Sequence, residues 1–237
     1  MAGETIKTEA ICLDIRPWSR TSHVVSWLTP AGRVATVVKG AVRAKSQFLG
    51  QYDLNYTCDI LYYARAKGEL HALRECAPVE LREVLRGDYR ALALAGYFRR
   101  LVAELSPAGE ECRAWYGLLE RALGSLSSPV SRLEAFIAFE LKVLELSGLK
   151  PDFSEFDADR EWSAFSVETG RFCAGEGRCV RVSREVADYL ASGAKNAKKS
   201  QTPLDAARVI GVFYQFHLDC ASDVRRTVLE MISNQGR

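Results

Sequence analysis

The sequence predicts an α+β protein in which a five-stranded β-barrel, residues 1–80, precedes a helical domain, residues 81–237. Two observations support this prediction. Apolar residues alternate with a period of two through the first part, and from Val79 onward they recur at the spacing of a helix. The two patterns follow one another along the chain, whereas a doubly wound βαβ enzyme would alternate them.

Five short strands are expected in the first part because turn signals separate its apolar alternations. The longest alternation runs from Leu54 to Tyr62, with Asn55, Thr57 and Asp59 on the opposite face. A small closed barrel fits these strands better than a flat sheet, because closure removes the exposed edges. The expected strands cover about residues 6–15, 23–28, 34–39, 52–64 and 69–76.

Helices are expected where the apolar spacing changes, and prolines and glycines mark several of their ends. Pro107 ends the first helix, Pro129 begins the third, and Thr202 is expected to cap a helix after a lysine-rich connection. Residues 150–182 show few helical signals, so an irregular insertion held together by aromatic side chains is expected there. The expected helices cover about residues 81–106, 110–123, 129–146, 183–191 and 204–232.

The composition of the 237-residue chain indicates a water-soluble, cytoplasmic protein. Hydrophobic residues make up 48% of it, and its mean hydropathy is -0.10. No apolar run approaches the ~18 residues of a membrane span, and the N-terminus lacks the charged-then-apolar order of a signal peptide. The seven cysteines are scattered and odd in number, so reduced thiols are expected.

Motifs for catalysis or metal binding are missing or incomplete. No phosphate-binding loop, dinucleotide fingerprint, zinc-protease motif or nucleophile elbow occurs, so the sequence predicts no enzyme. Cys173 and Cys179 could be half of a zinc site. A structural zinc usually needs four Cys or His ligands in close pairs, and Asp157 and Asp159 would be an uncommon second pair. No metal or other cofactor is therefore expected.

Positive charge is unevenly distributed, although the net charge is only +2. From Arg16 through Tyr52 the chain has six basic residues and neither aspartate nor glutamate, in a protein with 30 acidic residues. A surface of that kind usually faces phosphate, so nucleic-acid binding is favoured over an ordinary solvated face. The six are Arg16, Arg20, Arg33, Lys39, Arg43 and Lys45.

The segment around Gly40 has the composition of the groove in an oligonucleotide-binding (OB) barrel. Small residues let the backbone approach a sugar–phosphate chain, and exposed aromatic side chains stack on bases. Trp18 lies in a turn and is the expected stacking residue, whereas Trp27 alternates with apolar neighbours and is expected in the core. Tyr52 and Phe48 are further candidates. The predicted nucleic-acid-binding residues are Lys39, Arg43, Lys45, Arg33, Arg16, Arg20 and Trp18.

Several segments resemble the RecO family of bacterial recombination mediators, in the family's order over nearly the whole chain. TEAICLDIRPWSRTSHVVSWLTPAGRV (residues 8–34) and GELHALRECAPVE (68–80) resemble the opening and the close of its barrel. VVKGAVRAKSQF (37–48) resembles its V-x-K-G-A-R-R-x-x-S segment. FIAFELKVLELSGLKPDF (136–153) resembles its helical F-E-L-x-L-L-x-x-x-G-x-x-P segment.

The resemblance implies an OB-fold barrel, a helical domain and a nucleoid-associated role in recombinational repair. It implies a non-enzymatic protein that binds single- and double-stranded DNA and anneals complementary strands. With RecR, such a protein helps to load RecA onto strands coated by single-stranded-DNA-binding protein. Lys39 and Arg43 fall on the family's basic DNA-binding positions, and Val42 stands where a second arginine is usual.

The insertion departs from the family pattern. Many members bind zinc through two C-x-x-C pairs, but Phe156-Asp157-Ala158-Asp159 stands in place of the first pair. Of the second pair Cys173 is present and Cys179 is displaced, although the surrounding FSVETGRFC resembles the family scaffold. The resemblance therefore implies a degenerate, zinc-finger-like insertion without metal.

The family also takes the acidic, hydrophobic C-terminal tail of single-stranded-DNA-binding protein on its helical domain. The basic residues available for that tail are Lys195, Lys198, Lys199, Arg208, Arg225 and Arg226. Two other functions remain open, an OB-fold RNA- or tRNA-binding module and a structural adaptor. Tighter binding to structured RNA would favour the first, and a lack of salt-dependent nucleic-acid binding the second.

Overall fold

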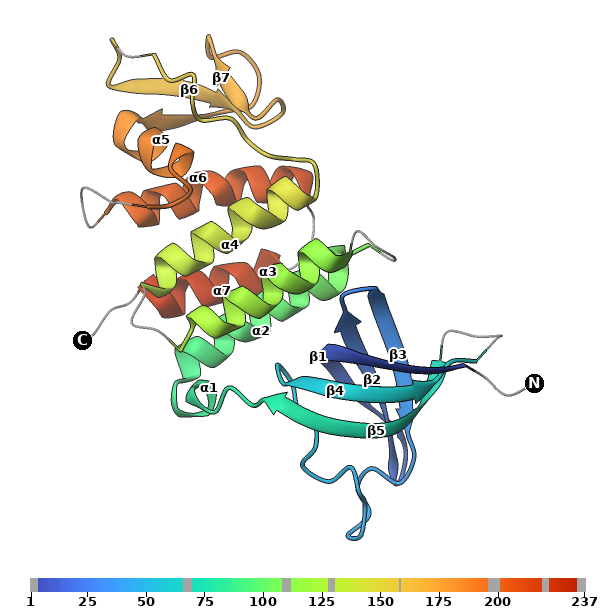
Figure 1. The fold of residues 1–237 in the computed structure, drawn as a ribbon. Coiled ribbons are helices and arrows are strands. Elements are labelled where there is room, and N and C mark those ends of the chain that lie inside the picture. Colours follow the sequence, from blue (N-terminus) through green and yellow to red (C-terminus); the bar gives the residue numbers. More distant parts are fainter. Residues whose placement is uncertain are drawn as a thin grey trace. The chain divides into compact units, whose positions relative to one another are not determined.

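The computed structural model describes most of the chain, in two compact units of residues 1–127 and 128–237. Each unit is described by itself (Figure 1). None of the helices in the described ranges is both long and apolar enough to cross a membrane. The described ranges are residues 4–65, 70–107, 112–127, 131–157, 159–195, 201–218 and 222–233.

A closed five-stranded barrel opens the first unit, as the sequence predicts (Figure 1). Around the barrel the strands follow the order β1-β2-β3-β5-β4, and only β3 and β5 pair in parallel. Register shifts between Cys12 and Asp14 and between Pro17 and Ser19 bend the long β1, which pairs with both β2 and β4. The strands are β1 (Thr5–Ser19), β2 (Ser22–Thr29), β3 (Gly32–Val38), β4 (Thr57–Tyr63) and β5 (Leu70–Glu80).

The barrel core consists of the inward-facing residues that the period-two pattern predicts. Trp27 is fully buried at its centre, and its indole Nε1 donates a 2.9 Å hydrogen bond to Thr36 Oγ1. The indole therefore keeps a polar partner inside an apolar core. Other members of this core are Ala10, Cys12, Val25, Val38, Tyr56, Cys58, Ile60, Tyr62 and Leu73.

The predicted fourth strand is wrong at its beginning. The strand starts at Thr57, and the residues from Gly40 to Tyr56 form a series of turns instead. Asn55 has a φ of 68°, a left-handed conformation that no strand tolerates, and this reverses the chain just before the strand. Leu54 is consequently exposed and does not join the buried face that Tyr56 and Tyr62 share.

Three helices complete the first unit, α1 (Val84–Gly87), α2 (Tyr89–Leu105) and α3 (Cys112–Ser125). The single helix expected over residues 81–106 is broken at Asp88. The backbone of Asp88 is extended, and its carboxylate accepts hydrogen bonds from the backbone N–H groups of Arg90 and Ala91. This is an N-cap, which starts a new helix directly after the short first one.

Helices α2 and α3 contact the outer face of the barrel. Arg99 of α2 donates a hydrogen bond to the backbone carbonyl of Leu13 in β1. Tyr116 of α3 donates one to the carboxylate of Glu9, also in β1. Polar contacts therefore attach the two helices to the barrel within this unit.

The domain boundary that the sequence suggests at residue 80 stays a prediction.

The second unit packs α4 (Arg132–Leu146), α5 (Arg184–Ala191) and α7 (Ser222–Ser233) with α6 (Thr202–His217). Helix α6 contacts both α4 and α5, and α4 contacts α7. The predicted cap at Thr202 is wrong by one position, because α6 includes this buried residue. Ser183 caps α5, and Gly148, with a φ of 73°, ends α4.

A buried ion pair joins three helices of this unit. Arg225 of α7 donates two 2.8 Å hydrogen bonds to the carboxylate of Glu140 in α4, whose side chain is 0% exposed. The same guanidinium donates to the backbone carbonyl of Ala207 in α6. Gly211 leaves room for it, because a Cβ atom at this position would overlap the Arg225 side chain.

The insertion is not irregular throughout, because residues 162–183 contain a three-stranded sheet. Its order is β7-β6-β8, with β6 (Trp162–Ser166) between β7 (Arg171–Cys173) and β8 (Cys179–Ser183). Strands of three to five residues carry too little alternation for recognition in the sequence.

Aromatic side chains hold this sheet, as the sequence predicts. Phe165 stacks on Phe153 with ring centroids 4.5 Å apart and meets Phe172 edge-on at 5.3 Å. Trp162 is the exception, because it is 46% exposed and lies under the guanidinium of Arg181. The sheet therefore packs on one aromatic cluster and leaves Trp162 outside it.

Candidate nucleic-acid interface

The end of β1, just before its turn to β2, carries the most exposed aromatic side chain of the basic region. Trp18 is 63% exposed, and Arg16 and Arg20 beside it are exposed as well. The predicted turn at Trp18 is wrong, because β1 continues to Ser19. Trp18 is nevertheless exposed, since it lies beyond the last inward-facing position of the strand, next to the register shift at Pro17. The predicted exposure of Trp18 and burial of Trp27 are both confirmed.

Two hydrogen bonds join the segment after β3 to this turn. The backbone N–H of Gly40 donates to Ser22 Oγ at 3.2 Å, and the N–H of Val42 donates to the carbonyl of Thr21 at 3.3 Å. Gly40 has a φ of 66°, a conformation suited to glycine, and a turn closed by Arg43 N–H and the Gly40 carbonyl follows. The basic segment is thereby fixed against the β1–β2 turn.

The strand register places Lys39 and Trp18 at the same end of the barrel. Pro17 in β1 pairs with His23 in β2, and His23 pairs with Val38 in β3. Trp18 and Lys39, which directly follow Pro17 and Val38, therefore lie about two strand spacings apart. Two spacings amount to about 10 Å. We call the resulting group the turn cluster. It consists of Arg16, Trp18, Arg20, Lys39, Arg43 and Lys45.

The positive charges of the turn cluster are largely uncompensated. Across the described ranges, Arg20, Lys39, Arg43 and Lys45 form no ion pair, and all four side chains are exposed. Arg16 differs, because its guanidinium pairs with Asp14. Four exposed cations without carboxylate partners, on the β1–β2 turn and the segment fixed to it, create a positive potential without any need for a large net charge.

The segment that carries Lys45 is anchored at several points. Successive turns run from Arg43 to Gln51, with Ser46 N–H donating to the Arg43 carbonyl at 2.9 Å and Gln51 N–H to the Phe48 carbonyl at 3.1 Å. Phe48 packs into the barrel core and is only 8% exposed. Phe48 is therefore an anchor of this segment and not a stacking residue.

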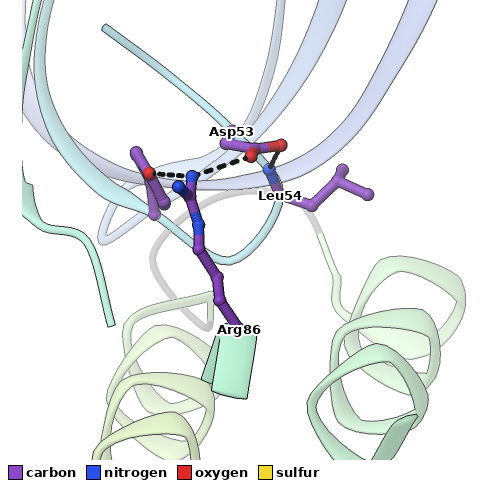
Figure 2. Close-up of polar contacts among 4 residues, drawn as sticks. Asp53, Leu54 and Arg86 are labelled. Carbon is purple, nitrogen blue, oxygen red and sulfur yellow. Dashed lines mark hydrogen bonds and ion pairs between the residues drawn. The ribbon is translucent and has the colours of Figure 1, made fainter. Parts of the chain in front are cut away.

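The end of the same segment is held by the first helix. In Figure 2 the Asp53 carboxylate faces both the Leu54 backbone and the Arg86 guanidinium. Asp53 accepts from Leu54 N–H at 2.8 Å and from Arg86 at 3.3 Å. Arg86 also donates to the hydroxyl of Tyr56. Asp53 and Arg86 are exposed, so their ion pair contributes little by itself, whereas Tyr56 is buried in the barrel core.

Arg82 makes the stronger attachment because it is buried. Its guanidinium donates to the carbonyl of Asn55 at 2.6 Å and to Thr57 Oγ1 at 2.9 Å. Burial lowers the pKa of Arg82, because removal from water disfavours the charged form. Sequence reasoning missed Arg82, since its two partners lie 25 and 27 residues away and no local pattern links them.

Tyr52 is also part of the barrel wall. Its hydroxyl lies 2.8 Å from His23 Nδ1, and its ring meets Trp27 edge-on at 6.0 Å. Burial raises the pKa of Tyr52 above its usual range. Among the four aromatic residues proposed from the sequence, Trp18 alone has most of its side chain in solvent.

Arg33 does not belong to the turn cluster. It lies at the beginning of β3, six residues before Lys39, which corresponds to about 20 Å along an extended strand. Its guanidinium donates to the backbone carbonyl of Ala103 in α2. The structure thus separates Arg33 from the other basic residues of the acid-free segment.

Comparison with known proteins identifies the family. The model of the recombination protein O N-terminal domain matches residues 1–82, and the model of its C-terminal domain matches residues 86–221. The chain belongs to the RecO family. A DNA repair protein RecO from Alkaliphilus metalliredigens is 31% identical over 176 residues, which cover 71% of this chain and 70% of that protein. One from Desulforudis audaxviator is 26% identical over 98% of this chain and 86% of its own length.

Membership in the RecO family confirms three of the predictions from the sequence. The chain is a DNA repair and recombination protein, it is a mediator and not an enzyme, and the family implies DNA binding. The turn cluster lies within the residues matched by the N-terminal RecO model.

The cysteine and aspartate residues considered for zinc do not form a ligand set within the described residues. Cys173 and Cys179 are close, but no group of three or more His, Cys, Asp or Glu within the described part of the chain could hold a metal. Asp157 pairs with Arg160 at 2.9 Å, and it also accepts a hydrogen bond from Asp159 N–H. These residues do not fit a structural zinc ion, which needs four ligands.

A groove of about 400 Å³ lies between α6 and α7 of this RecO-family chain. Val212, Leu218 and Leu229 are among its apolar lining residues, and Arg208 and Arg226 line it as well. Arg208 pairs with Asp205 at 3.1 Å, and Arg226 lies 3.8 Å from Asp223. All four of these side chains are exposed, so their pairing is weak.

The other basic residues considered for a protein partner differ in their surroundings. Arg225 also lines the groove but is held by Glu140. Lys195 is exposed and does not line the groove. Lys198 and Lys199 lie outside the described residues.

Proposed function

We propose that the turn cluster binds the sugar–phosphate backbone of single-stranded DNA and that the chain anneals complementary strands. We further propose that, with RecR, it helps to load RecA onto strands coated by single-stranded-DNA-binding protein. The observation that supports this is the pair of hydrogen bonds from Gly40 and Val42 to the β1–β2 turn. They hold unpaired cations and an exposed tryptophan on one surface.

The physical basis is neutralisation of phosphate charge. A cation that replaces condensed counterions on single-stranded DNA releases them, and binding weakens with salt by a slope of about −0.7 per phosphate. Contact through phosphates leaves base edges free to pair. Two strands repel each other less when one of them is neutralised, so the same surface promotes annealing and then holds the duplex.

Trp18 gives this surface a preference for unpaired strands. Its exposed indole offers a flat face, and stacking on a base contributes about 1–3 kcal/mol regardless of sequence. A duplex keeps its bases stacked on each other and offers no free base to the indole. Phosphate contacts therefore contribute to the binding of both single-stranded and duplex DNA, whereas the stacking contact contributes to the binding of single strands.

Annealing of complementary oligonucleotides coated with single-stranded-DNA-binding protein tests this function. The full chain is expected to accelerate annealing over the coated strands alone, and the Lys39→Ala/Arg43→Ala variant is expected to lose most of that acceleration. Lys7→Ala is a matched control, because Lys7 is an exposed cation near the other end of β1. Equal annealing by all three proteins would contradict the proposal, and tighter binding to structured RNA would favour an RNA-binding module.

The groove between α6 and α7 is the proposed site for the acidic, hydrophobic tail of single-stranded-DNA-binding protein. Its apolar lining suits the hydrophobic part of the tail, and Arg208 and Arg226 would exchange weak internal partners for the acidic part. Arg225 is unavailable for the tail because it is paired with Glu140.

The proposed contact with RecR rests on family membership alone.

Binding of a labelled peptide with the sequence of that tail tests the groove. Arg226→Ala and Arg208→Ala are expected to weaken binding by up to about fivefold each, since an exposed charge pair contributes up to about 1 kcal/mol. Lys195→Ala is the control outside the groove. A loss confined to Lys195→Ala would move the site away from α6 and α7.

A further inference from the structure

The ends of β7 and β8 bring two thiols together. Cys173 ends β7 and Cys179 begins β8, and their sulfur atoms lie 3.2 Å apart. The register places the two residues on either side of β6, and their side chains reach toward each other over this strand. Cys173 pairs with Ala164 and Cys179 pairs with Ser166, two residues further along β6. Residues two apart on a strand share a face, so both thiols lie on the same side of the sheet.

These two thiols are also more accessible than most of the other described cysteines. Cys12, Cys58 and Cys112 are fully buried, and burial raises the pKa of Cys12. Cys76 is half-buried, and its sulfur, like that of Cys58, faces the Gln51 carbonyl at 3.5 Å. Thiol exchange requires access to the sulfur as well as a nearby partner. Cys76 also lies beside a second thiol, but that partner, Cys58, is fully buried. In the Cys173–Cys179 pair neither thiol is fully buried.

The thiols lack the further ligands that would make them a metal site. Within the described residues no third His, Cys, Asp or Glu joins them in a suitable group. Their remaining polar contacts are to backbone carbonyls, Cys173 to Ala164 at 3.6 Å and Cys179 to Glu176 at 3.0 Å. A close pair of accessible thiols without additional ligands is suited to oxidation.

We infer that Cys173 and Cys179 form a reversible disulfide, which ties β7 to β8 covalently. The sulfur atoms must approach by about 1.2 Å to reach the ~2.05 Å bond length. Gly175 and Gly177, both with positive φ, lie in the connection between the strands. This connection has the backbone freedom that such a movement needs.

The oxidant is a low-molecular-weight disulfide such as oxidised glutathione. The Cys179 thiolate attacks one sulfur and forms a mixed disulfide, and the released glutathione thiolate takes up the proton that the Cys179 thiol lost. The Cys173 thiolate then attacks the Cys179 sulfur, and the second glutathione leaves with the proton from Cys173. In balance, two protein thiols become one disulfide and one oxidised glutathione becomes two thiols.

The bond would tie β7 to β8 across the central strand β6. Phe165 of β6 and Phe172 of β7 belong to the aromatic cluster that holds this sheet. A cross-link restricts the unfolded chain, so the oxidised form is expected to unfold at a higher temperature. The enclosed loop is short, and the expected increase is a few degrees.

Trypsin provides a direct test because it cleaves after Arg171, Arg178 and Arg181. The full chain is incubated with oxidised or reduced glutathione, its free thiols are alkylated, and it is then digested. Peptides 172–178 and 179–181 are expected to be linked after oxidation, and separate and alkylated after reduction. Two separate alkylated peptides after oxidation would overturn the inference, as would linkage of either cysteine to a different one.

The Cys173→Ser variant provides a second readout. Without its partner Cys179 should retain one glutathione under the oxidising conditions, because the second exchange step is lost. Absence of this adduct would contradict the proposed order of attack. Stoichiometric zinc on the purified wild-type protein, with both thiols protected from alkylation until chelation, would show a metal site instead and overturn the inference.

Discussion

Two groups of basic residues behave in opposite ways in this molecule. Arg82 in the first unit and Arg225 in the second are buried and satisfy backbone carbonyls or a carboxylate. Lys39, Arg43 and Lys45 of the turn cluster are exposed, and no described carboxylate pairs with them. The difference teaches that only a cation which the fold leaves without an internal partner is available to a ligand such as DNA.

The largest expected effect belongs to the buried group. Arg225→Met removes the guanidinium that donates two hydrogen bonds to the buried Glu140 carboxylate, and it should lower the free energy of unfolding by about 3–5 kcal/mol. Chemical denaturation monitored by circular dichroism measures this. Arg226→Met is the matched control on the same helix, because Arg226 is exposed. A similar loss in both variants would contradict a special role for the buried pair.

Trp18→Ala should have the largest effect on DNA binding among single changes in the turn cluster. Loss of base stacking is expected to weaken binding of an unstructured oligonucleotide by about 1–3 kcal/mol, with little change for duplex DNA. Fluorescence anisotropy with both substrates measures the difference. Trp18→Phe keeps an aromatic face and should restore part of the affinity. Equal losses on single strands and duplex would contradict stacking.

Val42→Arg is expected to strengthen DNA binding. Val42 is 51% exposed and directly precedes Arg43 of the turn cluster, at the position where the resemblance to the family implies a second arginine. One more phosphate contact should raise affinity at low salt and steepen the salt slope by about 0.7. Anisotropy titrations across a range of salt concentrations measure both quantities. An unchanged slope would place residue 42 away from the DNA.

Arg16→Ala should have the smallest effect on DNA binding. Its guanidinium already pairs with Asp14, so removal takes away a charge that is partly compensated. The expected loss of affinity is smaller than that of Lys39→Ala in the same titration. A larger loss would show that DNA displaces Asp14 and that the ion pair is broken on binding.

Much of the fold could be predicted from the sequence, because alternation and helical spacing are local patterns. The five strands and the contrast between Trp18 and Trp27 are examples. The break at Asp88 was missed because the apolar spacing continues through it, although the residue itself is a typical cap.

The site could be predicted less completely. A count of charges grouped Arg33 with Lys39, but the two lie at opposite ends of β3, and Arg33 is bound to Ala103. The turns from Gly40 to Tyr56 depend on Arg82 and Arg86, which are distant in the sequence. Contacts of this kind depend on how distant segments pack in the fold, and they produce no periodic pattern in the sequence.

The central claim is that the free cations of the turn cluster meet DNA phosphates. The salt dependence of single-stranded DNA binding by Lys39→Ala/Arg43→Ala tests it most directly. Loss of two contacts should flatten the slope by about 1.4 relative to wild type, equally for different base sequences. A slope and affinity identical to those of the wild-type protein would contradict the claim.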